Sequence, residues 1–307
     1  MTNFELKDCD VNKDGTHKES IFHRMENTMR QPLSSIIIPI FNDWEKFLDT
    51  ANKMPTTDEY ELICVDNLSD TVPESLPSKI IFVECSKAGS YAARNQGVEH
   101  SSGKYLIFTD ADCIPETDWA NQLVIYAEAN PGAIIAGDVV MTTRSNPNLA
   151  ECYDLLFGLP QKLYSHSNLA VTANLLVPKE IFKKVNGFSE NSYSGGDMHF
   201  CKKVNDRGYK LIFAENAIVY HPARRTLREL TKKIRRVNAG RLHSKHGISK
   251  ILYLFKIFVP PLRLILFGLQ KRYGTFIKIK GLFTMFIIWP YVVISTILTI
   301  IFRTQFR

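Results

Sequence analysis

The hydrophobic residues of this chain gather in short runs that alternate with longer amphipathic stretches. Four runs have the length and continuity of buried parallel strands, at 35–40, 61–65, 79–84 and 104–109. The stretches that separate or follow them predict helices, at 44–54, 91–100 and 117–130. This alternation predicts an α/β fold with a mostly parallel central sheet flanked by helices. In such folds ligands bind at the carboxyl ends of the strands.

The second half of the chain continues with strands whose connections are less regular. We expect these strands at 133–142, 172–177, 210–214 and 217–220. Residues 34–245 are therefore predicted to form one folded domain. Residues 1–33 are polar, mixed in charge and without the apolar core of a signal peptide, so we expect a flexible N-terminal arm there.

Charge divides the chain into two unequal parts. Residues 1–223 contain 20 Lys and Arg against 30 Asp and Glu, a net charge of −10. Residues 224–280 contain 16 Lys and Arg and a single acid, Glu229, a net charge of +15. An acidic domain is thus followed by a basic segment that would lie against anionic lipid head groups.

The C-terminal part, 246–307, is apolar as well as basic and is predicted to form membrane-associated helices. Residues 282–302 are uncharged over 21 positions, enough to cross a bilayer as a transmembrane helix. Residues 251–269 are interrupted by charges and by Pro260-Pro261, which favours an in-plane or re-entrant segment. A two-span hairpin and a buried helical hairpin remain alternatives.

The basic connector between these two segments predicts the orientation. Under the positive-inside rule it stays in the cytoplasm, which places the folded domain on the cytoplasmic face of the cell's inner membrane, as a single-pass or monotopic protein. The six cysteines are scattered without a Cys-x-x-Cys pair, consistent with reduced thiols in that compartment. The chain contains no dinucleotide-binding or P-loop glycine motif and no recognisable nucleic-acid-binding module, so we expect no nucleic-acid partner.

Two carboxylates follow the fourth predicted strand, one residue apart. Asp110 and Asp112 lie between an apolar run and Pro115, in the segment Gly-Lys-Tyr-Leu-Ile-Phe-Thr-Asp-Ala-Asp-Cys-Ile-Pro. Such a pair can hold one divalent cation, Mg²⁺ or Mn²⁺, with a phosphate on its far side. An Asp-rich turn with no ligand is the alternative.

Three further motifs precede this pair in a fixed order. They are Ile-Ile-Ile-Pro-Ile-Phe-Asn at 36–42, Val-Asp-Asn-Leu-Ser-Asp at 65–70, and the segment 86–97 that contains Ala-Ala-Arg-Asn-Gln-Gly. Together with the Asp-x-Asp, they resemble the family 2 glycosyltransferases of the GT-A fold over roughly residues 34–245. The resemblance implies an inverting glycosyltransferase that moves a sugar from a nucleoside-diphosphate sugar, most simply a UDP-sugar, to an acceptor hydroxyl.

The resemblance also assigns roles to residues of this chain. It implies that Asp112 is a metal ligand and that Asp110 contacts the ribose or is a second metal ligand. The implied nucleotide-sugar contacts are Pro39, Phe41, Asn42, Asp66, Arg94, Asn95 and Asp110. Arg94 can serve either by binding phosphate or by supporting the metal-binding carboxylates.

A later segment, 194–208, is similar to the family's Gly-Glu-Asp motif and implies that Asp197 is the catalytic base. Gly196 stands where the family usually has an acid, and His199 replaces the acid that follows. A helix N-cap is the alternative role for Asp197. His221, after the last predicted strand, is a further candidate metal or diphosphate ligand, or a simple strand-end histidine. Leu68 replaces a usual glycine.

The membrane tail and the implied activity together suggest a glycan or lipid-linked acceptor and a role in cell-surface polysaccharide or glycolipid assembly. Two alternatives remain from the sequence. One is a catalytically silent, membrane-tethered subunit that binds a sugar nucleotide. The other is an Asp-x-Asp phosphotransferase with Asp110 as nucleophile, which the position of the pair after the fourth strand disfavours.

Overall fold

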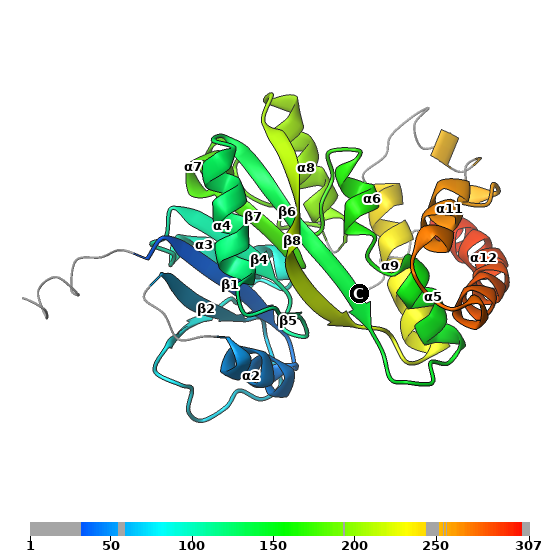
Figure 1. The fold of residues 1–307 in the computed structure, drawn as a ribbon, viewed down its shortest axis with the longest axis horizontal. Coiled ribbons are helices and arrows are strands. Elements are labelled where there is room, and N and C mark those ends of the chain that lie inside the picture. The colour runs from blue at the N-terminus through cyan, green and yellow to red at the C-terminus, as the bar shows by residue number, and fades with distance from the viewer. Residues whose placement is uncertain are drawn as a thin grey trace, which may run out of the picture.

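The computed structural model describes residues 32–54, 59–192, 194–243, 252–253, 255 and 257–302. Eight strands of these residues form one sheet, in the order β3-β2-β1-β4-β7-β6-β8-β5 (Figure 1). The strands are β1 (Ser34–Ile40), β2 (Tyr60–Asp66), β3 (Ile80–Glu84), β4 (Tyr105–Thr109), β5 (Ile114–Pro115), β6 (Ala133–Thr142), β7 (Asn174–Pro178) and β8 (Lys210–Pro222). The expected N-terminal arm lies outside the described residues except for its last two positions.

Helices cover both faces of the sheet, which confirms the α/β prediction (Figure 1). The helices of the described residues are α2 (Trp44–Lys53), α3 (Ser90–Glu99), α4 (Trp119–Ala129), α5 (Leu149–Phe157), α6 (Gln161–Ser165), α7 (Lys179–Lys184), α8 (Gly196–Asp206), α9 (Leu227–His243), α11 (Leu262–Gln270) and α12 (Thr275–Phe302). Two large apolar clusters result, one on each face, and alternate residues of β1 belong to opposite clusters.

The first half of the sheet is parallel, as the apolar runs predict. β1 pairs in parallel with β2 and β4, and β2 with β3. Because β1 and β4 are buried on both faces, their side chains form continuous hydrophobic runs rather than an alternating pattern. Their carboxyl ends therefore meet at one edge, where Asp66 ends β2 and Asp110 follows β4.

The second half of the sheet is mixed. β7 runs antiparallel to both β4 and β6, β6 and β8 are parallel, and β5 is antiparallel to β8. The two predicted strands 210–214 and 217–220 form the single long strand β8, whose register with β6 shifts between Gly137 and Asp138. The buried Asn174 bridges this shift, since its Nδ2 donates to the carbonyl oxygens of Asp138 and Ala217, each at 2.8 Å.

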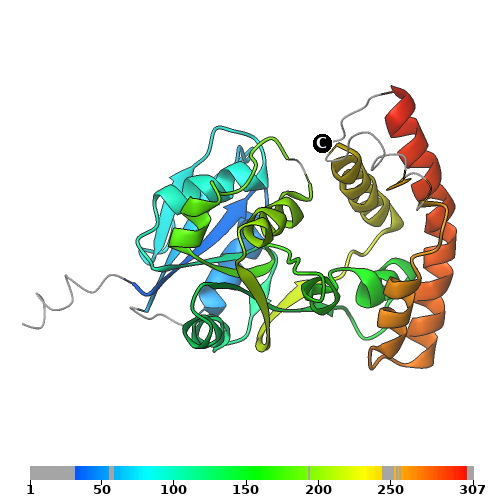
Figure 2. The same cartoon turned by 90° about the horizontal axis from the view of Figure 1, so that it is seen from above.

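Helices α5, α9, α11 and α12 form a separate layer at one side of the molecule (Figure 1). Figure 2 shows α12 running along this side, with α9 next to it. Among the described residues, the segment Thr275–Leu298 of α12 is the one stretch long and apolar enough to cross a membrane by length and composition. It includes Pro290.

Candidate active site

A tight turn after β4 carries the two carboxylates of the Asp-x-Asp pair. The backbone N–H of Cys113 donates to the carbonyl oxygen of Asp110 at 3.1 Å, so the chain reverses directly after the strand. The residues that follow form β5, in which Ile114 pairs with Tyr220 of β8. This pairing brings the turn beside His221, which lies 109 positions later than Asp112 in the chain.

The ligand atoms of Asp110, Asp112, Cys113 and His221 all lie within 4.8 Å of one another. The His221 Nε2 is 3.6 Å from the Asp112 Oδ1, and the imidazole is 6% exposed. The other ring nitrogen, Nδ1, donates to the carbonyl oxygen of Pro222 at 2.9 Å. Because a carbonyl can only accept, Nδ1 carries the hydrogen of this bond, and the ring is held with Nε2 turned toward the carboxylates.

This donor set fits a divalent cation. Two carboxylates and one imidazole nitrogen are ligands that Mn²⁺ accepts, whereas Mg²⁺ prefers oxygen ligands alone. Burial raises the pKa of the Cys113 thiol well above its usual value, so this cysteine stays protonated and is a poor ligand for a hard cation. The residues that would hold the ion are therefore Asp110, Asp112 and His221.

Arg94, on α3, supports the first of these carboxylates. Its Nη2 donates to the Asp110 Oδ1 at 2.5 Å, and its side chain is only 3% exposed. The Nη1 donates to the carbonyl oxygen of Ser90 at 3.3 Å, while the Nε is buried with no hydrogen-bond partner among the described residues. Of the two roles expected for Arg94, the structure therefore displays the support of a metal-binding carboxylate.

Asp197 lies in the first turn of α8 and faces the same arginine. Its Oδ1 accepts a hydrogen bond from the backbone N–H of Met198 at 2.8 Å. Burial raises the pKa of the Asp197 carboxyl, and the charge of Asp110 acts in the same direction. The backbone N–H of Met198, the Arg94 guanidinium and a hydrogen bond from Tyr91 oppose this rise in pKa. Arg94 thus connects the carboxylate cluster with Asp197.

A second polar group, the carboxylate of Asp66, lies at the end of β2. Asp66 is 7% exposed, and its Oδ2 accepts a hydrogen bond from the backbone N–H of Ser69 at 3.3 Å. Its Oδ1 is buried with no hydrogen-bond partner among the described residues. A buried carboxylate oxygen without a donor is costly, so this atom is suited to accept a hydrogen bond from a ligand.

Comparison with known proteins supplies the context for this geometry. Residues 35–185 match the family described as Glycosyl transferase family 2. Glycosyltransferase AglE from Haloferax volcanii is 34% identical over 228 residues, which cover 70% of this chain and 75% of that protein. The chain belongs to glycosyl transferase family 2. The succinoglycan biosynthesis protein ExoM from Rhizobium meliloti is also similar, 24% identical over 65% of this chain and 71% of its own.

Solved structures agree with this family on the fold. The mannosyltransferase PcManGT from Pyrobaculum calidifontis, determined with GDP-Man and Mn²⁺, superposes with a TM-score of 0.51 at 14% identity, covering 90% of this chain and 80% of its own. TarS 1–349 from S. aureus, determined with UDP-GlcNAc, gives 0.50 at 15% identity, covering 82% and 72%. The chain is a glycosyltransferase with the GT-A fold. The phosphotransferase alternative is therefore wrong.

The ring of Tyr91 occupies the space that the side chain of the family's usual acid would need at position 196. The sequence analysis did not single out this tyrosine. A Cβ built on Gly196 would lie 2.6 Å from the Tyr91 ring, so no side chain fits there. Tyr91 is 6% exposed and interacts with Asp197. On a helix, residues three apart share a face, and the spacing of Tyr91 and Arg94 on α3 was the signal that could have identified it.

Asn95 has a different set of partners from the predicted nucleotide contact. Its Nδ2 donates to the Phe188 carbonyl oxygen at 3.0 Å and to the Glu190 Oε1 at 3.1 Å. Its Oδ1 accepts from the backbone N–H of Phe188 at 3.0 Å. The whole amide group therefore holds the loop at Phe188 and Glu190, which precedes α8.

The predicted nucleotide contacts that end or follow β1 are at least partly exposed. Phe41 is 60% exposed and Pro39 is half-buried. The Asn42 side chain forms a reciprocal pair with Asp70, its Nδ2 donating to the Asp70 Oδ2 at 2.9 Å and its Oδ1 accepting from the Asp70 N–H at 2.8 Å. The structure thus uses Asn42 to fix the loop after Asp66.

Leu68 and His199, two departures from the family pattern, both lie near the surface. Leu68 has a φ of 66°, in the left-handed region that favours the family's usual glycine, and is 50% exposed. The exposed His199 follows Asp197 on α8.

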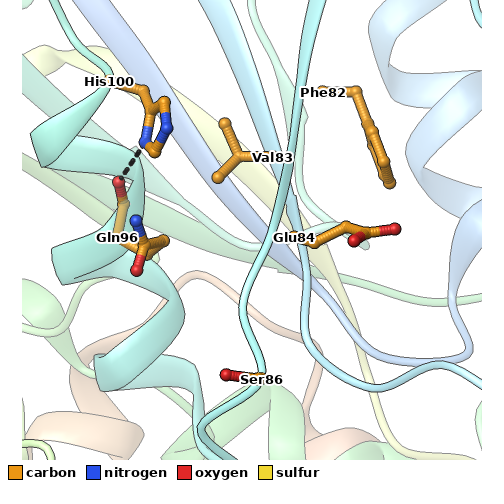
Figure 3. A pocket seen from close by; sticks show the side chains of 6 residues that line it. All are labelled: Phe82, Val83, Glu84, Ser86, Gln96 and His100. Atoms are coloured by element: carbon orange, nitrogen blue, oxygen red, sulfur yellow. Dashed lines mark hydrogen bonds between the residues drawn. The ribbon is translucent and has the colours of Figure 1, made fainter.

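A surface hollow of about 460 Å³ lies elsewhere, at the edge strand β3 and helix α3 (Figure 3). Its lining residues are Phe82, Val83, Glu84, Ser86, Gln96 and His100. None of the predicted site residues lines this hollow, so the donor site is assigned from its polar groups instead.

Proposed function

We propose that this protein is an inverting glycosyltransferase that moves a sugar from a nucleoside-diphosphate sugar, with UDP-sugars as the donor class, to an acceptor hydroxyl. The observation that carries the proposal is the connected group of Asp110, Asp112, His221, Arg94 and Asp197. It unites a site for a divalent cation with a buried carboxyl that can act as a base.

The donor site is assigned to the carboxyl ends of β2 and β4. Asp110, Asp112 and His221 would hold Mn²⁺ or Mg²⁺, and a bound cation neutralises charge on the diphosphate as it leaves. Asp66 offers a buried acceptor oxygen to an N–H of the base or to a ribose hydroxyl. Arg94 holds Asp110 in place through a charge-assisted hydrogen bond.

Asp197 is assigned the role of general base. The acceptor hydroxyl gives its proton to this carboxylate while its oxygen forms a bond to the anomeric carbon. The bond between that carbon and the diphosphate oxygen breaks, and the nucleoside diphosphate leaves with the bonding electrons. A single displacement of this kind inverts the anomeric configuration. Burial strengthens the base by raising the pKa of Asp197 toward the working pH.

The acceptor is proposed to be a glycan or lipid-linked glycan at the cytoplasmic face of the membrane, in cell-surface polysaccharide or glycolipid assembly. The apolar helix α12, which is uncharged over residues 282–302, and the basic segment 224–280 support membrane attachment. ExoM, which is similar over 65% of this chain, is named for the biosynthesis of a polysaccharide.

The test is calorimetric titration of the full-length protein with UDP, GDP and dTDP, with and without Mn²⁺. We expect one nucleotide to bind in a Mn²⁺-dependent manner and Asp112→Asn to weaken that binding by about 100-fold. Asp118→Asn, an acid at the start of α4, is the matched control and retains binding. If no nucleotide binds to the folded protein, the proposal is wrong. Binding without transfer would favour the catalytically silent subunit.

A further inference from the structure

Helix α12 has two faces that differ in what they contact. One side, here called the inner face, consists of buried residues, at Gly281, Thr284, Met285, Ile288, Ser295 and Thr296. The opposite side, here called the outer apolar face, consists of Phe276, Ile279, Phe283, Phe286, Ile287, Tyr291, Ile294, Ile297 and Leu298, each more than one-third exposed. The buried positions recur at helical spacing from 281 to 296, so the inner face is docked along about 22 Å of helix.

The first half of this inner face rests on α5. A Cβ on Gly281 would lie 2.5 Å from the Leu156 Cδ1, which shows how closely the two helices approach. The Thr284 hydroxyl donates to the carbonyl oxygen of Leu149 at 3.1 Å. Met285 packs in one cluster with Leu156. α5 is therefore held close against α12 by both apolar and polar contacts.

The second half rests on α9. Ile288 and Leu230 belong to one buried cluster, and the Asn238 Nδ2 donates to the Thr296 Oγ1 at 3.4 Å. α9 contains six Lys and Arg residues and one acid, Glu229. If α12 crossed a bilayer while docked, this charged helix would have to enter the hydrocarbon, which is strongly unfavourable. If α12 left α9 and α5, its Thr and Ser hydroxyls and the apolar surfaces of both partners would be exposed.

Helix α11, which contacts α12, also has exposed apolar side chains, at Leu262, Leu266 and Leu269. Exposed apolar side chains along α12 from 276 to 298 are rare on a protein that is surrounded by water alone. Basic side chains, at Arg263 and Arg272, lie in and directly after α11. No acidic residue follows Glu229 in the sequence. The surface therefore combines exposed hydrocarbon with uncompensated positive charge, which is complementary to an anionic lipid surface.

We propose that α12 lies in the plane of an anionic membrane, with its outer apolar face and that of α11 in the lipid and its inner face on the enzyme. This differs from the transmembrane helix that the length of 282–302 predicts. It deepens the membrane attachment in the proposed function. Because α5 is anchored to the chain just after β8, where the Arg224 N–H and Nη1 both donate to the Asp154 Oδ2, the membrane plane is set relative to the candidate active site.

Spin labels on the outer apolar face distinguish the two orientations. We would place single cysteines at Phe276, Phe283, Ile294 and Leu298 in a Cys9→Ser background; the other five native cysteines are buried. In vesicles of phosphatidylcholine with phosphatidylglycerol, an in-plane helix gives all four labels a similar depth. A spanning helix places 276 and 298, about 33 Å apart along the axis, at opposite interfaces and 283 to 294 deepest. The second pattern overturns the proposal.

Vesicle binding provides an independent measurement. Ile287→Glu, on the outer apolar face, is expected to weaken binding to anionic vesicles by at least about tenfold. Ile125→Glu, on α4 and 56% exposed, is the matched control and is expected to bind like the wild type (Figure 1). Titration with UDP and Mn²⁺ verifies that both variants fold, and it separates a failure of this proposal from a failure of the donor site. If Ile287→Glu instead converts a dimer to a monomer and leaves vesicle binding unchanged, the face joins two copies of the chain.

Discussion

The Nη2 of Arg94 lies 2.5 Å from the Oδ1 of Asp110, and the same guanidinium lowers the pKa of Asp197. One buried guanidinium therefore acts on both parts of the proposed site, the carboxylates assigned to the donor and the base assigned to the acceptor. Because the Arg94 side chain is 3% exposed, solvent does not screen either interaction.

Replacement of Arg94 by lysine tests this shared role. A lysine retains the charge but presents a single nitrogen, so it cannot reach Asp110 and also face Asp197 as the planar guanidinium does. We expect Arg94→Lys to lower the rate of sugar transfer by about 100-fold. Arg144→Lys changes an exposed arginine bound to Glu151 and serves as the control, with transfer unaltered. Full activity in Arg94→Lys would show that charge alone suffices.

Asp197→Asn is expected to abolish transfer and yet stabilise the fold. Loss of a general base costs about 10²–10⁴-fold in rate. The pKa of Asp197 is higher in the folded protein than in the unfolded chain because of burial, so the folded state binds the proton more tightly. Stability from this group is complete below the unfolded pKa and is lost as the pH rises through the folded pKa.

Calorimetric melting at two pH values checks this expectation. At pH 7 the asparagine variant, which has no proton to lose, should melt at a higher temperature than the wild type. At acid pH, below the pKa of this carboxyl in both the folded and the unfolded states, the difference should shrink. A variant that melts lower than the wild type at pH 7 would show that the carboxylate stabilises the fold instead.

Tyr91→Phe tests whether the hydroxyl of Tyr91 positions and tunes Asp197. The hydrogen bond from Tyr91 lowers the pKa of Asp197, so its removal should raise that pKa further. The acid limb of the kcat/KM profile is then expected to move to higher pH. Tyr126→Phe on α4 is the control. A lower rate with an unmoved acid limb would mean that Tyr91 only packs against Gly196.

Part of this site can be predicted from the sequence because buried parallel strands are recognisable from their sequence pattern. Apolar runs predict β1, β2 and β4, and polar residues directly after such strands must meet at one edge of the sheet. The sequence therefore predicts the positions of Asp66 and Asp110 at that edge correctly. His221 reaches Asp112 only because β5 pairs with β8, and nothing in local periodicity specifies a pairing between segments so far apart in the chain.

The two motif residues Arg94 and Asn95 show where a resemblance needs helix geometry. Neighbours on a helix point about 100° apart, so the two side chains leave the helix in different directions. The structure directs Arg94 to Asp110 and Asn95 to the loop at Phe188. The helical spacing of α12 was likewise visible, but its buried stripe depends on α5 and α9, which only tertiary packing places beside it.

The loop after Asp66 carries backbone strain that a single substitution can release. Leu68 has a φ of 66°, which costs a residue with a Cβ about 1–2 kcal/mol, and part of this is regained in glycine despite its greater freedom in the unfolded chain. The Leu68 side chain is 50% exposed, so little buried surface is lost on its removal.

We therefore expect Leu68→Gly to raise the free energy of unfolding by about 0.5–1 kcal/mol, measured by urea denaturation at constant slope. Val72→Gly is the matched control: it removes an aliphatic side chain of similar exposure, 42%, from the same loop at a residue with negative φ. It should destabilise, because glycine there gains freedom only in the unfolded chain. If both variants lose stability equally, the left-handed backbone at Leu68 is not strained, and its side chain contributes to the loop through packing.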